Sequence, residues 1–288
     1  MNYQIAILHH EFDNLGSIGA YAINALADIW RKDGHTVINL FGIRKFIPAD
    51  LIIVHVDLSV VPAEYITFAE RYPIVLNGKA QDIRKSSFSR YLLQKDDPYT
   101  GPVFIKSNTN SAGMSESRLR KFSLFGFSTG QYTAKVLNIL QYSFASNTIH
   151  RASDYLVVGS LQEVSPKWFK RKNIVIQKFC PEFEDGLYHT RFYNFLGDHG
   201  DCMRISSREP VVNIRSSVSV ERSNVHPKIE KMRRDLQFDY GKFDYVIHEG
   251  EPVLLDINKT TGTSTKLASP ELKKLLRHRA SGLYSYFR

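Results

Sequence analysis

The sequence predicts an α/β protein, with a parallel α/β domain at the N-terminus followed by lobes of the α+β type. Two patterns lead to this prediction. Over residues 1–76, short and almost continuously apolar strands alternate with helical segments, which is typical of a parallel sheet covered by helices on both faces. Over residues 240–260, two alternating strands flank a tight Glu-Gly turn, which is typical of an antiparallel hairpin.

The N-terminal segment is expected to alternate strands and helices. Strands are expected at 4–8, 36–41, 51–56 and 73–76, and helices at 20–32 and 62–71. In such sheets a ligand binds at the carboxyl ends of the strands, where His9, His10, Glu11 and Asp57 lie. The loop 14–19 could bind an anion at the start of the first helix. It lacks the full GxGxxG pattern, so a loop that only turns the chain is the favoured interpretation.

Composition limits the classes of function. The chain has 288 residues, of which 43% are hydrophobic and 23% charged, as in ordinary globular proteins. Its formal net charge of +9 indicates anionic partners. The basic residues form short scattered clusters and no nucleic-acid motif, so nucleic acid is a less favoured partner than an acidic substrate. No apolar stretch approaches the roughly 18 residues of a membrane span. We therefore expect a cytoplasmic protein in which Cys180 and Cys202 are free thiols.

The central segment contains two lysines of interest. Residues 77–93 are expected to form a turn followed by a helix, and this helix carries Lys85. Lys106 closes the apolar strand 103–106 and is followed by the Ser-rich and Gly-containing loop 107–113, so it is placed to hold a phosphate while the loop folds over it. The alternative is an edge-strand lysine beside a surface loop. Segment 114–150 has no clear periodicity.

The aromatic residues between 122 and 144 are compatible with a buried lobe or with a partner surface, including that of a homodimer. Downstream, strands are expected at 154–158 and 173–179, followed by a hairpin of strands 187–196 and 201–206. Helices are expected at 227–236 and from 270 onward.

The hairpin at 240–260 carries oxygen side chains. Asp256 and Asn258 are two residues apart on one strand, so they point to the same face. Asp244 lies roughly opposite Asp256 if the strands pair symmetrically about the turn at 248–251. Carboxylate and amide oxygens suit Mg²⁺, which commonly keeps waters and substrate phosphates as further ligands. The alternative is a strand that simply enters a polar loop.

The order of these parts resembles the ATP-grasp family of carboxylate ligases over residues 77–265, and the preceding segment resembles that family's N-terminal domain. The resemblance depends on Lys85, Lys106, the run Gln177-Lys178-Phe179-Cys180, Arg191, and Asp244 with Asp256-Ile257-Asn258. It implies three parts: a Rossmann-like N-terminal domain at 1–76, a central ATP-grasp lobe at 77–178, and a C-terminal ATP-grasp lobe with the metal site at 179–288.

The resemblance also implies residue roles. Lys85 and Lys106 are expected to contact the α- and β-phosphates of ATP. The hinge that reads the adenine edge is expected at Gln177, Lys178, Phe179 and Cys180. Glu184, or with less support Glu182, is expected to bind the ribose. The ligands of one or two Mg²⁺ ions are expected to be Asp244, Asp256 and Asn258. Many family members have Glu in place of Asp256, and the shorter aspartate makes bridging of two ions less assured.

The implied function is an ATP- and Mg²⁺-dependent ligase that converts a carboxylate into an acyl phosphate and joins it to an amine, releasing ADP and phosphate. The expected substrates are small molecules or peptides, preferably anionic. The resemblance implies that Arg191 faces the phosphates or the acyl group. The candidates for holding the carboxylate or acyl phosphate are Arg204, Arg208 and Arg215, because a guanidinium grips such groups with two parallel hydrogen bonds, although a surface position is at least as favoured for Arg215. Lys259 and Thr263 are further candidates to face the substrate. Two alternatives stay open: a two-domain glycosyltransferase, and an ATP-binding protein without catalysis.

Overall fold

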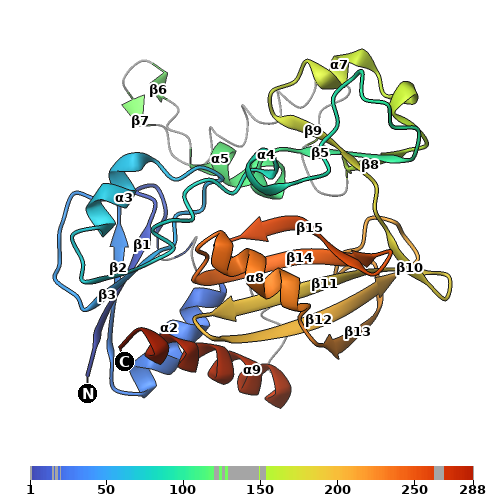
Figure 1. Ribbon diagram of the computed structural model, residues 1–288. Helices are drawn as coiled ribbons and strands as arrows, with labels where there is room; N and C mark the ends of the chain where they lie inside the picture. Colours follow the sequence, from blue (N-terminus) through green and yellow to red (C-terminus); the bar gives the residue numbers. More distant parts are fainter. Residues whose placement is uncertain are drawn as a thin grey trace.

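The structure is a computed structural model that describes residues 2–14, 16, 19, 21–119, 123–124, 127–128, 149, 154–262 and 269–287. Figure 1 shows three parts, an N-terminal domain, a central lobe and a C-terminal lobe, with both chain termini beside the first. Among the described residues, no helix is long and apolar enough to cross a membrane. Cys180 and Cys202 are free and buried.

The N-terminal domain contains the expected parallel sheet. Its elements are β1 (Gln4–His9), α2 (Ala22–Lys32), β2 (Thr36–Phe41), β3 (Leu51–Val54), α3 (Ala63–Ala69) and β4 (Ile74–Leu76). The strand order is β2-β1-β3-β4, and all pairs are parallel. Helix α2 packs on one face through Leu26 and Trp30, and α3 packs on the other through Tyr65 and Phe68.

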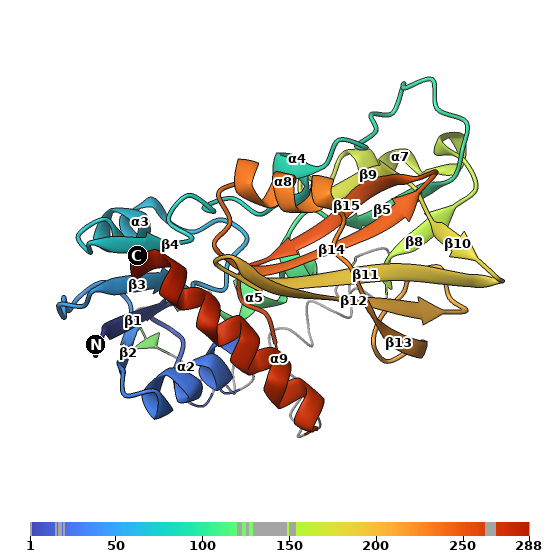
Figure 2. The same cartoon turned by 60° about the horizontal axis from the view of Figure 1, so that its bottom comes forward.

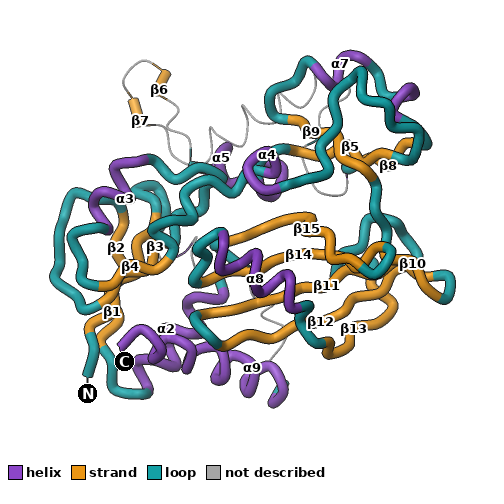
Figure 3. The backbone as a smooth tube through the Cα atoms, viewed as in Figure 1, coloured by secondary structure: helices purple, strands orange, loops and turns teal. Residues whose placement is uncertain are grey.

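The central lobe is built on a small antiparallel sheet with the order β8-β5-β9. Its elements are α4 (Lys85–Phe88), β5 (Val103–Ser107), η1 (Asn110–Gly113), α5 (Met114–Arg118), β8 (Leu156–Val158), η3 (Leu161–Glu163), α7 (Pro166–Phe169) and β9 (Ile174–Lys178). A two-residue pair, β6 (Ser123–Leu124) and β7 (Phe127–Ser128), lies apart from it. Figure 3 shows that much of this lobe is loop.

Helix α4 is much shorter than the sequence predicts. The expected helix ran toward residue 93, but α4 has only 4 residues. The Ser87 hydroxyl donates to the Arg84 carbonyl at 2.6 Å, and such local bonds compete with helix propagation. The chain then joins the sheet, because Leu93 N–H donates to the Ile176 carbonyl at 2.8 Å. Tertiary pairing therefore ends the helix early.

The C-terminal lobe is a six-stranded antiparallel sheet with the order β13-β12-β11-β14-β15, and β10 pairs with β11. Its elements are β10 (Glu182–Glu184), β11 (Leu187–Leu196), β12 (His199–Ser207), β13 (Ser217–Ser223), α8 (Pro227–Asp235), β14 (Tyr240–His248), β15 (Glu251–Asn258), α9 (Pro270–Ser281) and η4 (Gly282–Phe287). In Figure 2, α9 lies next to α2, and its buried end contacts the N-terminal domain, where Trp30 Nε1 donates to the Ala280 carbonyl at 2.9 Å.

The two faces of this sheet have different roles. Ile229 of α8 packs with Phe195 and Phe243, so we call this side the α8 face. Phe192 pairs with Asp244, and Asp244 pairs with Asp256, so these three side chains point to the opposite side. We call that side the cleft face.

A bulge interrupts the hairpin of β14 and β15. Asp244 pairs with Asp256, whereas the next residue, Tyr245, pairs with Leu254, which leaves Leu255 as the extra residue. The register places the two aspartates opposite each other, as the position of the turn predicts. The bulge itself is not apparent from the sequence pattern.

The close packing of α9 against the sheet makes Gly282 sensitive to substitution. A Cβ atom at this position would lie 1.9 Å from the Leu196 carbonyl oxygen, which belongs to the backbone and cannot rotate away. We expect Gly282→Ala to lower the free energy of unfolding by about 3 kcal/mol or more, because α9 must move off β11. Urea denaturation measures this loss.

Gly159→Ala is the matched control, since its new Cβ would meet only the flexible end of Glu163. The control should unfold close to the wild-type midpoint. Equal stability of the two variants would show that α9 does not pack against Leu196 as described.

Candidate functional site

Two buried lysines of the central lobe reach across to β15. Lys85 begins α4, and its N–H donates to the Asn108 carbonyl at 2.9 Å, which attaches α4 to the end of β5. Only 1% of the Lys85 side chain is exposed. Its Nζ lies 3.1 Å from Asp256 Oδ1 and donates to the Thr109 carbonyl at 3.2 Å. Lys85 thus forms an ion pair between two lobes.

Lys106 lies on β5 and is almost fully buried. Its Nζ donates to the Leu255 carbonyl at 2.9 Å, so the extra residue of the bulge supplies the acceptor. Burial lowers the pKa of Lys106 to about 7, and the charge of Lys85 acts in the same direction, while Asp256 and Asp244 oppose it. The ammonium has donors to spare and makes no hydrogen bond to a carboxylate of the described residues, so an anion in the cleft would stabilise its charged form.

Asp244 and Asp256 form the acidic part of the site. Burial raises the pKa of Asp244, and Asp256 adds to this effect, while Lys242 lowers it. Lys242 Nζ donates to Asp244 Oδ2 at 3.0 Å and lies 4.1 Å from the centre of the Phe192 ring. Asp244 and Asp256 therefore lie at the same edge of the hairpin, with Lys242 bound to the first and Lys85 bound to the second.

Asn258 lies on the same face as Asp256, but its oxygen is engaged. Asn258 Oδ1 accepts from Thr260 N at 2.8 Å and lies 3.2 Å from Thr260 Oγ1, whose proton goes to Asp57. The amide therefore holds the chain as it leaves β15. Its oxygen would have to share this bond with a metal ion.

The residues present fit Mg²⁺ as a partly hydrated ion. Within the described ranges, no group of three His, Cys, Asp or Glu side chains could hold a metal. Mg²⁺ does not require such a cage, since it is commonly bound by one or two carboxylates together with waters and substrate phosphates. Asp244 and Asp256, with Asn258 beside them, supply that donor set.

A small cavity lies next to Lys106, at the connection between the lobes. Its walls include Phe104 of β5, Cys180, and Val246 and Leu255 of the hairpin. Its volume is about 30 Å³, far below the roughly 300 Å³ of a typical ligand pocket, so a base would enter only if the lobes separated further. The cavity is apolar enough to accept one face of a ring.

Three of the four expected hinge residues, Lys178, Phe179 and Cys180, line this cavity, and their backbone bonds differ. Lys178 N–H donates to the Tyr91 carbonyl and Phe179 N–H to the Pro102 carbonyl, both at 2.9 Å. For Cys180, no backbone hydrogen bond is found within the described part of the chain. Cys180 N–H is therefore the hinge donor left for a ligand.

Gln177 carries an unsatisfied amide. Its side chain is fully buried, and neither Oε1 nor Nε2 has a hydrogen-bond partner among the described residues. Gln177 pairs with Phe104, so its side chain points to the same side of the sheet as Phe104 and Lys106. Leaving such a group unpaired costs about 1–3 kcal/mol, so a polar ligand at the hinge would recover stability.

The expected catalytic arginines do not join the carboxylates. Arg191 pairs with Tyr245, so it lies on the α8 face, opposite to Asp244. Arg191 Nη2 donates to Glu182 Oε1 at 2.7 Å, and Arg204 Nε donates to the same oxygen at 3.2 Å. Sequence spacing does not reveal this, because a shift of one residue reverses the face of a strand.

The two candidate ribose ligands differ in availability. Glu182 is buried, and its Oε2 accepts from Ile247 N at 2.7 Å, so both oxygens are occupied. The Glu184 side chain is 63% exposed and pairs with Arg204. Arg208 is exposed in the loop after β12, and no ion pair of it is found within the described ranges.

A buried network that the sequence does not reveal joins all three parts. Asp57, after β3, accepts from Tyr21 Oη at 2.7 Å and from Ser115 and Thr260, and Arg118 donates to it at 3.1 Å. Burial acts to raise the pKa of Asp57, but the hydrogen bonds from Ser115, Thr260 and Tyr21 outweigh it and the pKa is lowered. The position of Asp57 at a strand end was a signal, but its partners are too distant in the sequence to be inferred.

Other expected residues lie elsewhere. Lys259 is buried and donates to the Ala80 and Gln81 carbonyls at 3.2 and 3.4 Å, away from the aspartates. Burial lowers the pKa of Lys259 to about 7. Thr263 lies outside the described residues, as do most of segment 114–150 and much of the loop 14–19.

Comparison with known proteins gives matches among solved structures. No family model and no curated protein matches the chain. The chain is similar to a RimK domain protein ATP-grasp from Sphaerobacter thermophilus, with 12% identity, coverage of 97% of this chain and 98% of that chain, and a TM-score of 0.44.

Two further structures match over nearly their whole length. One is D-alanine–D-alanine ligase from Bacillus anthracis complexed with ATP, with 9% identity, coverage of 99% and 96%, and a TM-score of 0.48. The other is the ATP-grasp ligase PsnB complexed with a phosphomimetic variant of minimal precursor, Mg and ADP, with 10% identity, coverage of 99% and 98%, and a TM-score of 0.49. ATP-grasp proteins are thus among the matches. Similarity at this level specifies neither a substrate nor a residue role.

The burial of Lys106 has a pH-dependent effect on stability. Its folded-state pKa of about 7 lies below the 10.5 of an exposed lysine. Between these values the unfolded chain binds a proton that the folded chain does not, so wild-type stability rises with pH in this window. Lys106→Met should stabilise the protein most below pH 7. Its advantage should then shrink by up to about 1.4 kcal/mol per pH unit as the pH rises.

Urea denaturation near pH 6 and near pH 8.5 measures this difference. Lys95 is exposed, so Lys95→Met is the control and should change stability equally at both pH values. A constant difference between wild type and Lys106→Met would contradict the lowered pKa of Lys106.

Proposed function

We propose that this chain is an ATP-grasp ligase, which uses Mg²⁺ and ATP to activate a carboxylate and join it to an amine. The observation that carries the proposal is the convergence of Lys85 and Lys106 from one lobe on Asp244 and Asp256 of the other. Buried cations beside paired carboxylates are costly for a purely structural role, because each charge must be removed from water. A polyphosphate with a metal ion matches both sets of charges.

The nucleotide would extend along the cleft face from the hinge to the aspartates. The adenine would lie in the apolar cavity, with Cys180 N–H and the Gln177 amide as its polar partners. Lys178 and Phe179 would frame it, since both line the same cavity. Of the two acids, Glu184 is the better candidate for the ribose, because the oxygens of Glu182 already accept three hydrogen bonds from protein groups. Glu184 would have to leave Arg204 and turn from the α8 face toward the cleft to bind it.

The phosphates would replace protein groups as partners of the lysines. Lys85 now pairs with Asp256, and Lys106 now donates to the Leu255 carbonyl. When a phosphate takes the ammonium of Lys85, Asp256 becomes free to hold the metal together with Asp244 and Asn258. Bound Mg²⁺ would neutralise charge on the terminal phosphates.

The proposed reaction needs positioning more than a protein nucleophile. A substrate carboxylate oxygen attacks the γ-phosphorus, ADP leaves, and an acyl phosphate forms. An amine then attacks the acyl carbon and inorganic phosphate leaves. Lys85 and Lys106 would hold the α- and β-phosphates and stabilise the charge that develops on the leaving ADP.

The arginines receive different roles in this proposal. Arg191 and Arg204 would position Glu182 next to the hinge, because both bind its Oε1. Arg208 stays a candidate for the substrate carboxylate, since it is exposed and its guanidinium forms no ion pair in the described part of the chain. The network of Asp57, Arg118 and Thr260 would join the N-terminal domain to the end of β15.

A two-domain glycosyltransferase has less support. That function requires a second parallel sheet late in the chain, whereas the described residues after β9 form an antiparallel sheet. A protein that binds ATP without catalysis has the same charges in its cleft. Only a product assay separates it from a ligase.

The test measures MgATP binding by calorimetry and acyl phosphate formation by trapping with hydroxylamine, which converts an acyl phosphate into a stable hydroxamate. Wild type should bind MgATP and form a hydroxamate with a carboxylate from a panel of amino acids and short peptides. Lys106→Ala and Asp256→Asn should each weaken MgATP binding about tenfold or more, because each removes a charged partner of the phosphate or the metal.

Lys95→Ala removes an exposed lysine and should behave as wild type. Wild-type protein that binds no MgATP, or that binds it equally well after both cleft substitutions, would contradict the proposal. Tight binding without hydroxamate or ADP from any carboxylate would favour the protein without catalysis.

A further inference from the structure

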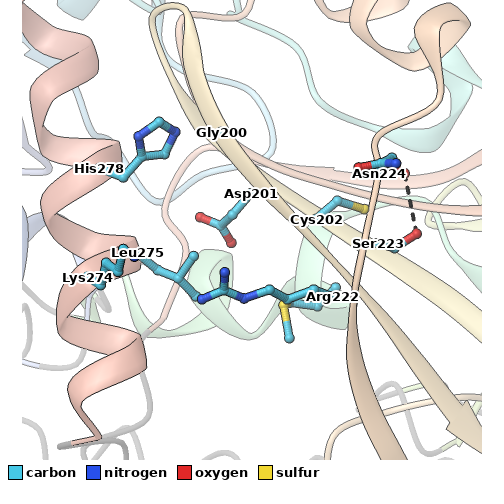
Figure 4. Close-up of a pocket in the computed structure, with 10 residues that line it drawn as sticks. Gly200, Asp201, Cys202, Arg222, Ser223, Asn224, Lys274, Leu275 and His278 are labelled. Atoms are coloured by element: carbon cyan, nitrogen blue, oxygen red, sulfur yellow. Dashed lines mark hydrogen bonds between the residues drawn. The ribbon is translucent and has the colours of Figure 1, made fainter.

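A second and larger cavity lies between the β12–β13 edge of the sheet and α9 (Figure 4). Its volume is about 450 Å³, which is within the usual range of ligand pockets. Arg222 reaches into it from β13, and Lys274 and Leu275 face it from α9. Asp201 and Met203 contribute from β12. The adenine cavity proposed above shares none of these residues.

The lining of this cavity has an excess of positive charge. Arg222 and Lys274 are exposed, and neither forms an ion pair within the described ranges. Asp201, the only carboxylate of the lining, is already neutralised: its Oδ1 accepts from Arg279 Nη2, and both side chains are less than a tenth exposed. Two cations from different elements thus converge on one concave surface. An anionic ligand would be their natural partner.

The cavity opens on the same sheet face as the metal ligands. Arg222 pairs with Met203, Met203 with Phe192, Phe192 with Asp244, and Asp244 with Asp256. These residues form one row across the strands. A parallel row runs from Asn258 through Lys242 and Asn194 to Asp201. With neighbouring strands about 4.8 Å apart, Arg222 lies roughly 14 Å from Asp244 along the sheet.

We propose that this cavity binds an anionic side chain or terminal carboxylate of an acidic peptide, whose reacting carboxylate lies at the aspartates. The inference rests on the proposed function and specifies its substrate. A gap of roughly 14 Å corresponds to about four residues of extended chain. Met203 and Leu275 offer apolar contacts to the methylene groups of a glutamate-like side chain.

Nucleic acid fits this cavity less well. Single strands are bound by stacking platforms beside an extended basic groove. The one ring in the lining, that of His278, is already stacked on His199 with ring centres 4.5 Å apart. The cations are confined to a single concave site, which suits one acidic group better than a phosphate backbone.

The test compares the affinity of tetraglutamate and tetraglutamine for the full chain by calorimetry, with and without MgATP. Wild type should prefer tetraglutamate. The double variant Arg222→Ala/Lys274→Ala should lose about tenfold or more in tetraglutamate affinity. Its MgATP affinity should stay unchanged, because neither residue lies near Lys85 or Lys106. The milder pair Arg222→Gln/Lys274→Gln should show the same loss.

The matched control is Arg234→Ala/Lys273→Ala, which removes the same charge from exposed positions outside the cavity. It should change tetraglutamate affinity less than about twofold. Equal losses in both double variants would overturn the proposal, since they would indicate attraction to the overall charge. Preference for oligouridylate that disappears with the cavity pair would also overturn it. Failure of wild type to bind MgATP would count against the proposed function alone, because the tetraglutamate comparison would still decide the cavity.

Discussion

The ion pair between Lys85 and Asp256 is the interaction on which the arrangement of the cleft depends. It joins α4 of the central lobe to the edge strand of the C-terminal lobe at 3.1 Å, with the lysine almost completely removed from water. Removing one member of such a pair leaves an uncompensated buried charge, at a cost of about 3–5 kcal/mol. Loss of either charge would therefore weaken the contact between the lobes before any ligand arrives.

The same charges explain how the cleft could open. A pair that is satisfied internally gives little energy to a ligand unless both members gain new partners together. A metal-bound polyphosphate supplies an anion for the lysine and a cation for the aspartate at once. A free anion or a free cation would satisfy only one of them. Ligands with both charges are therefore favoured over simple salts.

The sequence predicts the parts of this protein better than their orientation. Alternating apolar segments indicate the parallel sheet, and the symmetry of the hairpin about its turn places Asp244 opposite Asp256. The side on which Arg191 lies depends on its register with β14, which no local pattern specifies. The bonds of Asp57 to Thr260 connect positions 203 residues apart, so only the folded chain brings them together.

The bulge at Leu255 lets one strand serve two ends of the cleft. In a regular strand, Val253 and Asp256 would point to opposite sides, because they are three residues apart. The extra residue changes the phase of the side chains, so Val253 pairs with Val246 while Asp256 pairs with Asp244, all on the cleft face. It also leaves the carbonyl of Leu255 outside the ladder, where Lys106 binds it. Positions 253–256 thereby provide an apolar wall, a main-chain acceptor and a carboxylate. Because this order depends on backbone geometry, it tolerates the substitution of a side chain more easily than the deletion of one residue.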